Sequence, residues 1–200
     1  MTSKKGLLAL LLLLGGCAGL PPAAGSAAGD DPRAPLVAPD ARIALPRPAD
    51  LGRSVEVAQL ITVRREGQTF AFEGHMSVTP EAFTLVGLDG MGRRTMTLTW
   101  TDAGIQSESA PWLPDAVRPG SMLADIVLLY WPDAAVRKAL APVGGTLASD
   151  DHTRSIRVGG RDLMEAKHSW SSGGPWTGTL HYTNRAWGYE IDVQSVETPR

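Results

Sequence analysis

Position 17 holds the single cysteine of this 200-residue chain, and its thiol is the most nucleophilic side chain present. It follows an apolar run, residues 7–14, which is itself preceded by Lys4 and Lys5. Two cationic residues, a short apolar run and small residues in this order are typical of a secretory signal peptide, and the run is too short to span a bilayer. Since the sequence offers no second thiol, alkylation of Cys17 explains it better than a disulfide does.

The cleavage region resembles the lipobox of bacterial lipoproteins, with a match at every position: Leu14, Gly15, Gly16 and Cys17. The resemblance implies that residues 1–16 are a lipoprotein signal peptide and that Cys17 becomes an acylated N-terminus. Ala rather than Asp at position 18 implies that the lipoprotein is located at the periplasmic face of the outer membrane of a Gram-negative bacterium. Several acyl chains on one cysteine anchor a protein without a transmembrane helix. The alternative is an ordinary signal peptide with an incidental cysteine.

Composition excludes some classes of partner. Removal of residues 1–16 takes away two lysines, so the formal net charge falls from -2 to -4, and no basic stripe remains to favour nucleic acid. Residues 17–49 are rich in alanine and hold seven prolines, which predicts a disordered tether. The remaining part, residues 50–200, has the length of a single domain.

The histidines give little support to catalysis. The closest pairing of histidine with carboxylates is Asp150-Asp151-His152, in a predicted loop, where a solvated turn is the simpler interpretation. The sequence has no Gly-x-Ser-x-Gly and no phosphate-binding glycine motif with its lysine. We therefore expect no enzyme, no metal and no cofactor; a hydrolase or acyltransferase at His152 is the least favoured alternative.

Alternation of apolar and polar residues with period two predicts an antiparallel meander with one apolar face. The predicted strands, separated by turn residues such as Asp89-Gly90 and Asn184-Arg185, cover residues 53–63, 69–78, 82–88, 95–101, 154–158, 162–170, 176–183 and 187–193.

The alternation stops in residues 121–132, which are apolar except for Ser121 and Asp125. Ser121 is a candidate cap, Pro132 a stop, and residues 134–140 a second short helix. A buried strand is the alternative for the first segment. Asp125 is costly to bury alone, so it either points to solvent or pairs with an arginine such as Arg93, Arg94 or Arg137, or else it holds a movable lid.

The same segment resembles the signature of the lipoprotein family numbered 3261 among domains of unknown function. Six residues carry this resemblance and form the candidate lid: Leu123, Ala124, Asp125, Tyr130, Trp131 and Pro132. The family is distantly similar to the LolA/LolB group, a lipoprotein carrier and its receptor. The resemblance implies a mainly β (α+β) fold, in which a strongly curved antiparallel sheet forms a half-open barrel with a helical lid around residues 121–140.

This resemblance also implies an apolar cavity for an acyl chain, an acylated protein or an aryl-polyene-type lipid. The candidate lining residues are Phe70, Phe72, Met76, Phe83, Met96, Trp100, Leu128, Leu129, Trp187 and Tyr189. An ordinary packed core explains each of them equally well. Two functions follow: a carrier that binds or passes on an apolar ligand, or a scaffold lipoprotein of an envelope lipid or polyene synthesis system. The sequence leaves the oligomeric state open.

Overall fold

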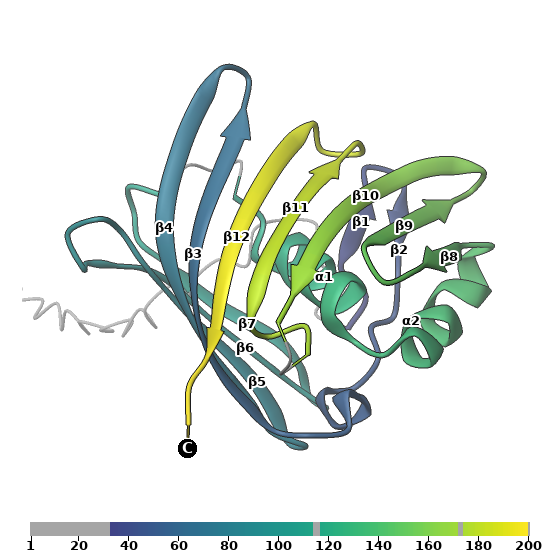
Figure 1. The fold of residues 1–200 in the computed structure, drawn as a ribbon, viewed down its shortest axis with the longest axis horizontal. Coiled ribbons are helices and arrows are strands. Elements are labelled where there is room, and N and C mark those ends of the chain that lie inside the picture. The colour runs from purple at the N-terminus through teal and green to yellow at the C-terminus, as the bar shows by residue number, and fades with distance from the viewer. Residues whose placement is uncertain (1–32, 114–116, 172–173, 200) are drawn as a thin grey trace, which may run out of the picture.

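The computed structural model describes residues 33–113, 117–171 and 174–199, and the fold is mainly β (Figure 1). Ten strands form one antiparallel sheet in the order β7-β6-β5-β4-β3-β12-β11-β10-β9-β8. The sheet is not closed into a barrel, because β7 and β8 lie at its two edges. The strands are β3 (Val55–Arg65), β4 (Gln68–Val78), β5 (Ala82–Leu88), β6 (Arg94–Thr101), β7 (Gly104–Ser109), β8 (Thr146–Ser149), β9 (Thr153–Val158), β10 (Arg161–Trp170), β11 (Gly178–Asn184) and β12 (Tyr189–Glu197).

The predicted meander is confirmed, and its turns follow from their residues. Between β3 and β4, Glu66 and Gly67 both have positive φ, 52° and 75°, which is the twist that a two-residue hairpin requires. This turn fixes the register, so that Val57 lies opposite Met76 and both face the core. Trp187 is an exception to the prediction, since it lies in the turn before β12 rather than in the strand.

Two helices, α1 (Pro119–Tyr130) and α2 (Asp133–Leu140), interrupt the strands, which confirms the predicted helices over the alternative of a buried strand. A short 3-10 turn, η2 (Ala141–Val143), follows them. The predicted cap is wrong, because α1 begins two residues before Ser121, with Pro119 in its first turn. Its end follows from Pro132: the residue before a proline avoids the helical region, and Trp131 has an extended ψ of 154°.

The tether predicted for residues 17–49 is wrong for residues 33–49, which belong to the folded part. They form a small hairpin, β1 (Leu36–Ala38) and β2 (Ala41–Arg42), and lead into a 3-10 turn, η1 (Pro48–Leu51). Val37 and Ile43 are fully buried. Burying such side chains contributes about 1.5–3 kcal/mol each, which offsets the entropy of ordering a proline-rich segment. The rest of the predicted tether and the leader lie outside the described residues.

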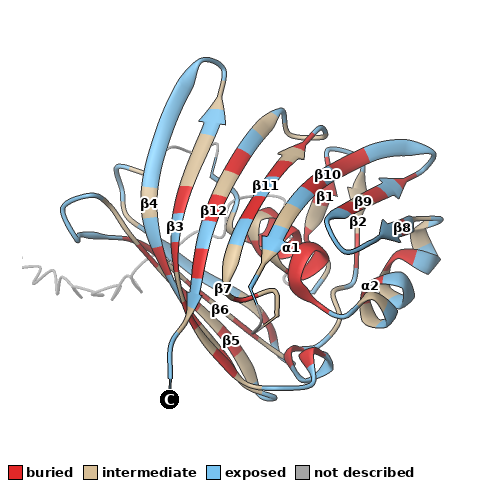
Figure 2. Ribbon diagram, in the orientation of Figure 1, coloured by how far each residue is buried: buried red, intermediate tan, exposed pale blue. Residues whose placement is uncertain are grey.

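The core lies between one face of the sheet and α1. Figure 2 shows α1 buried along most of its length, with buried positions alternating along the strands that it covers. Leu123, Val127 and Leu128 have no exposed surface. Among the described residues, no helix combines the length and the apolar character needed to cross a membrane.

Candidate functional site

The residues predicted to line a cavity separate into two groups. Six are buried in the core: Met76, Phe83, Met96, Trp100, Leu128 and Leu129. Phe72, Trp187 and Tyr189 are partly buried, and Phe70 is 47% exposed. The buried group is therefore part of the packing between the sheet and α1.

Aromatic rings fill the interior around Trp131, which is 1% exposed. Its ring centroid lies 6.3 Å from that of Phe83, 5.9 Å from Trp100 and 6.2 Å from Trp176. Tyr130 stacks on the other side of Trp176 at 4.7 Å. These separations are those of packed aromatic pairs. The space that the sequence assigned to a ligand is therefore occupied here by side chains, including Trp176, which the cavity prediction did not contain.

Two residues of the second group, Phe70 and Phe72, mark an apolar strip that is not fully covered. Phe72 pairs with Ile61 and Phe70 pairs with Val63, at the hairpin end of β3 and β4. By alternation these residues share the face of Met76, which is buried. Ile61 is 8% exposed, whereas Val63 and Phe72 are only partly buried. The core-forming face of the sheet thus continues past α1 as an apolar surface open to solvent.

Asp125 lies on α1 and is 1% exposed, so the prediction that it points to solvent is wrong. Its partners come from β11 and β12. The Asn184 amide donates to Oδ1 at 3.0 Å and the Tyr182 hydroxyl donates to Oδ2 at 3.3 Å. The Tyr189 hydroxyl also donates to Oδ2. The carboxyl group therefore joins α1 to two strands through neutral donors.

The predicted arginine partners of Asp125 are also wrong. Arg93 pairs with Asp89 and Arg137 pairs with Asp133, while Arg94 has no ion pair within the described residues. Because no cation compensates the buried carboxylate, burial raises the pKa of Asp125 to about 7, although the hydrogen bonds from the tyrosines and Asn184 oppose the shift. The group thus titrates near neutral pH.

Two further buried contacts fix α1 at its other end. The Gln59 amide bridges the hydroxyls of Tyr130 and Ser195, at 3.2 and 2.9 Å. Arg154, on β9, donates to the carbonyl of Leu128 at 2.7 Å and to that of Trp131 at 3.0 Å. A guanidinium satisfies here the carbonyl groups that a helix end leaves without partners. Arg154 also pairs with Asp133 at 2.8 Å.

Sequence reasoning missed these partners for a specific reason. The sequence pattern predicts a strand residue at Tyr182, a turn residue at Asn184 and the start of a strand at Arg154. Their contacts with α1 join positions that are 57, 59 and 26 residues apart. One sequence feature indicates that such partners exist: a carboxylate inside an apolar helix, such as Asp125, requires hydrogen-bond donors from elsewhere in the fold.

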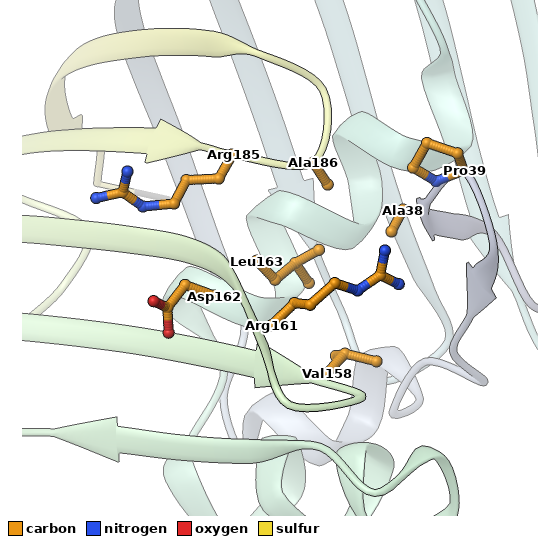
Figure 3. A pocket seen from close by; sticks show the side chains of 8 residues that line it. All are labelled: Ala38, Pro39, Val158, Arg161, Asp162, Leu163, Arg185 and Ala186. Atoms are coloured by element: carbon orange, nitrogen blue, oxygen red, sulfur yellow. The ribbon is translucent and has the colours of Figure 1, made fainter.

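Two of the cavities that the described residues form are open to solvent, and neither is lined by the aromatic side chains around Trp131. One, of about 230 Å³, lies between the turns that follow β1, β9 and β11, and its lining includes the buried residues Ala38 and Leu163 and the charged residues Arg161, Asp162 and Arg185 (Figure 3). The other, of about 290 Å³, lies mainly on the face of β3, β4 and β5 that points away from the core, and Met76 is the one residue of its lining that the sequence predicted for the cavity. Neither is an enclosed apolar chamber.

The Asp150–His152 segment is a turn. Asp150 accepts hydrogen bonds from the backbone N–H of His152 at 2.8 Å and of Thr153 at 2.7 Å, and these bonds lower the pKa of its carboxyl group. His152 is exposed. Within ranges 33–113, 117–171 and 174–199, no group of three or more histidine, cysteine, aspartate or glutamate side chains is placed to hold a metal.

Comparison with known proteins gives a family. The sequence model described as "Protein of unknown function (DUF3261)" matches residues 56–197. The chain belongs to the DUF3261 family. The match includes α1, nine of the ten strands of the sheet in full, and all of β3 except Val55. The polar partners of Asp125 therefore lie in the family domain. No curated protein matches this DUF3261 chain.

Among solved structures, a DUF1329 family protein from Desulfovibrio piger is similar to this DUF3261 chain at 9% sequence identity, with a TM-score of 0.32. The similarity covers 74% of this chain and 87% of the other. A likeness at this level supports no conclusion about function. The lipobox residues, with Cys17, lie outside the described residues.

Proposed function

We propose that this protein is a lipoprotein of the outer membrane, anchored through acylated Cys17, whose folded domain binds an apolar chain-like ligand in the periplasm and passes it on. The proposed function is binding and transfer without catalysis. It includes a curved, half-open barrel of the LolA/LolB kind, in which α1 covers part of the inner face. The ligand class is an acyl chain, the acyl group of another lipoprotein or an aryl-polyene-type lipid.

One observation carries the proposal: the core-forming face of the sheet continues beyond α1 as an uncovered apolar strip. The strip consists of Val63, Phe70 and Phe72, next to buried Ile61. An exposed apolar surface that continues from a core is typical of an interaction site, and covering it with an apolar partner removes it from water. A bound chain contributes about 0.8 kcal/mol for each methylene that it buries.

The contacts of α1 support a role as a cover. Asp125, Tyr130 and Arg154 hold the helix through hydrogen bonds to strands, and each of these groups can exchange its partner for water when the helix moves. A ligand that starts on the strip could then extend under α1, where Met76 and Leu128 lie. In this proposal the packed interior is the unliganded state.

A second function is favoured by the packing of the same interior. Because Trp131, Phe83 and Trp176 fill the space under α1, a scaffold lipoprotein of an envelope synthesis system requires no cavity at all. In that case the uncovered strip contacts a protein partner. The two functions differ in whether an isolated chain binds a free apolar molecule.

The test compares two aspartate substitutions at similarly exposed apolar positions. Phe70 is 47% exposed on the strip, and Leu60 is 53% exposed on the opposite face of the neighbouring strand. The full chain is titrated with a fluorescent conjugated fatty acid, and the dissociation constant is measured for wild type, Phe70→Asp and Leu60→Asp. We expect Phe70→Asp to weaken binding by about tenfold or more, because it removes apolar contact and places a charge against the chain.

Leu60→Asp is expected to bind like wild type. Equal binding by all three proteins would show that the ligand does not bind at the strip. Absence of binding by the wild-type chain would favour the scaffold function.

A further inference from the structure

The helix α1 is buried on more than one side. Leu123, Ala124 and Asp125 are consecutive residues, and each is at most 1% exposed. Successive residues of an α-helix point about 100° apart, so a single flat surface cannot cover all three. The sheet covers one side of α1, and β1 of the N-terminal hairpin also lies against the helix (Figure 1). The hairpin therefore completes the burial of α1.

We call residues 35–47, which contain β1 and β2, the strap. Val37 and Ile43 come before and after its turn, and both are fully buried in the core that includes the helix. The indole N–H of Trp131, directly after α1, donates to the carbonyl of Arg47 at 3.2 Å. The strap thus contacts α1 through β1 and reaches its C-terminal end.

The strap is separate from the main sheet. Its two strands form a sheet of their own, so the hydrogen-bond ladder of the ten-stranded sheet does not hold them. At its turn Asp40 accepts from the guanidinium of Arg161 at 2.7 Å, but these side chains are 61% and 64% exposed, and an ion pair in solvent contributes little. The cavity of about 230 Å³ lies at this turn, between Pro39 and Leu163 (Figure 3). The strap can therefore leave its seat without breaking the main sheet.

We propose that the strap keeps α1 closed, and that its release is the step that lets an apolar chain enter and leave beneath the helix. The inference rests on the proposed function, in which α1 covers the ligand. Since β1 lies against α1, the helix moves away from the sheet only when the strap moves with it or before it. The strap is also the first folded segment described after Cys17, so a force on the anchor acts on the strap before it acts on the sheet.

Hydrogen exchange of the full chain, with peptides analysed by mass spectrometry, measures the opening of α1. Val37→Ala shortens a fully buried side chain of the strap, and Val78→Ala makes the same change at a fully buried position of β4. We expect Val37→Ala to raise exchange in α1 about tenfold and to change exchange in β3 and β12 much less. Val78→Ala should not raise exchange in α1 above that in the sheet. An unchanged α1 in Val37→Ala, or an equal rise in both variants, would overturn the proposal.

A second pair of variants tests the contact at the turn of the strap. Asp40→Arg places two guanidinium groups against each other and should raise exchange in α1 about threefold. Asp40→Arg combined with Arg161→Asp restores an ion pair with the charges exchanged, and should return exchange in α1 to the wild-type value. Equal exchange in the single and the double variant would count against a strap held at this contact.

Release of ligand connects the strap to function. The full chain is loaded with the fluorescent conjugated fatty acid, and its release into an excess of unlabelled fatty acid is timed. We expect Val37→Ala to release it several-fold faster than wild type, and Val78→Ala to release it at the wild-type rate. Equal rates for Val37→Ala and wild type would contradict the role of the strap. If the wild-type chain binds no fatty acid, the proposed function fails, and hydrogen exchange alone then decides whether the strap holds α1.

Discussion

Replacement of Asp125 by asparagine should change how stability depends on pH. The carboxyl group has a pKa of about 7 in the folded protein, against 3.8 for the free group. Between these two values the folded state binds a proton that the unfolded state does not, so the free energy of unfolding falls as pH rises through this window. About three pKa units at about 1.4 kcal/mol each give a loss of about 4 kcal/mol between pH 4 and pH 8.

Asp125→Asn should remove this loss. The new amide can accept from the amide of Asn184 and donate to the hydroxyls of Tyr182 and Tyr189, so the variant keeps the contacts of α1 without a buried charge. We expect it to be more stable than wild type at pH 8 by about 4 kcal/mol and similar to wild type near pH 4.5.

The assay is urea unfolding at intervals between pH 4.5 and pH 8.5, with the difference between variant and wild type plotted against pH. His168 also makes stability depend on pH, because burial lowers its pKa and the free energy of unfolding then rises with pH below the ordinary pKa of histidine. Wild type and variant share this contribution, so it cancels in the difference. Asp162→Asn, at an exposed carboxyl group that pairs with Arg157, is measured alongside as a control for the loss of a surface carboxylate. A flat difference for Asp125→Asn would refute the assignment of a buried, uncompensated carboxylate.

Three other substitutions test the packing around α1 and the sheet by the same unfolding assay. Arg154→Leu should destabilise by about 2–4 kcal/mol, because it leaves two buried helix carbonyls without donors, and equal stability would show that water replaces the guanidinium. Phe83→Ala should cost about 3–5 kcal/mol, since Phe83 is fully buried among aromatic rings; a loss below about 1 kcal/mol would contradict a filled interior. Gly178→Ala should also destabilise strongly, because φ is 134° and a Cβ would lie 2.2 Å from the carbonyl oxygen of Ser169, and a neutral result would mean that β10 and β11 separate easily there.

The strands could be predicted from the sequence because their apolar faces read directly as alternation. Met96, Leu98 and Trp100 alternate with threonines, and all three are buried. The helix was also predictable, since Pro132 limits a run that lacks period two. Local chemistry decides such features.

The N-terminal hairpin was missed because composition hides it. Residues 33–49 read as a linker by their prolines and alanines, yet Val37 and Ile43 are enough to dock the segment on a core that other residues supply. A segment that depends on distant partners carries no local signal of its own.

The candidate site was only half predictable. The sequence marked Asp125 as a residue that needs a partner, but its donors are tyrosines and an amide brought near by the register of β11 and β12. Phe70 and Met76 lie on the same face of β4 and are both apolar, yet Met76 is buried and Phe70 is 47% exposed, which alternation alone does not distinguish.

The most direct test of apolar ligand binding is native mass spectrometry of the full chain purified from bacterial membranes in a mild detergent. We predict one apolar molecule bound per chain, released on activation and identified by its own mass, and lost from the Phe70→Asp variant but retained by Leu60→Asp. A wild-type chain that carries no adduct, and takes up none from added phospholipids, acylated peptides or polyene lipids, would contradict the carrier function.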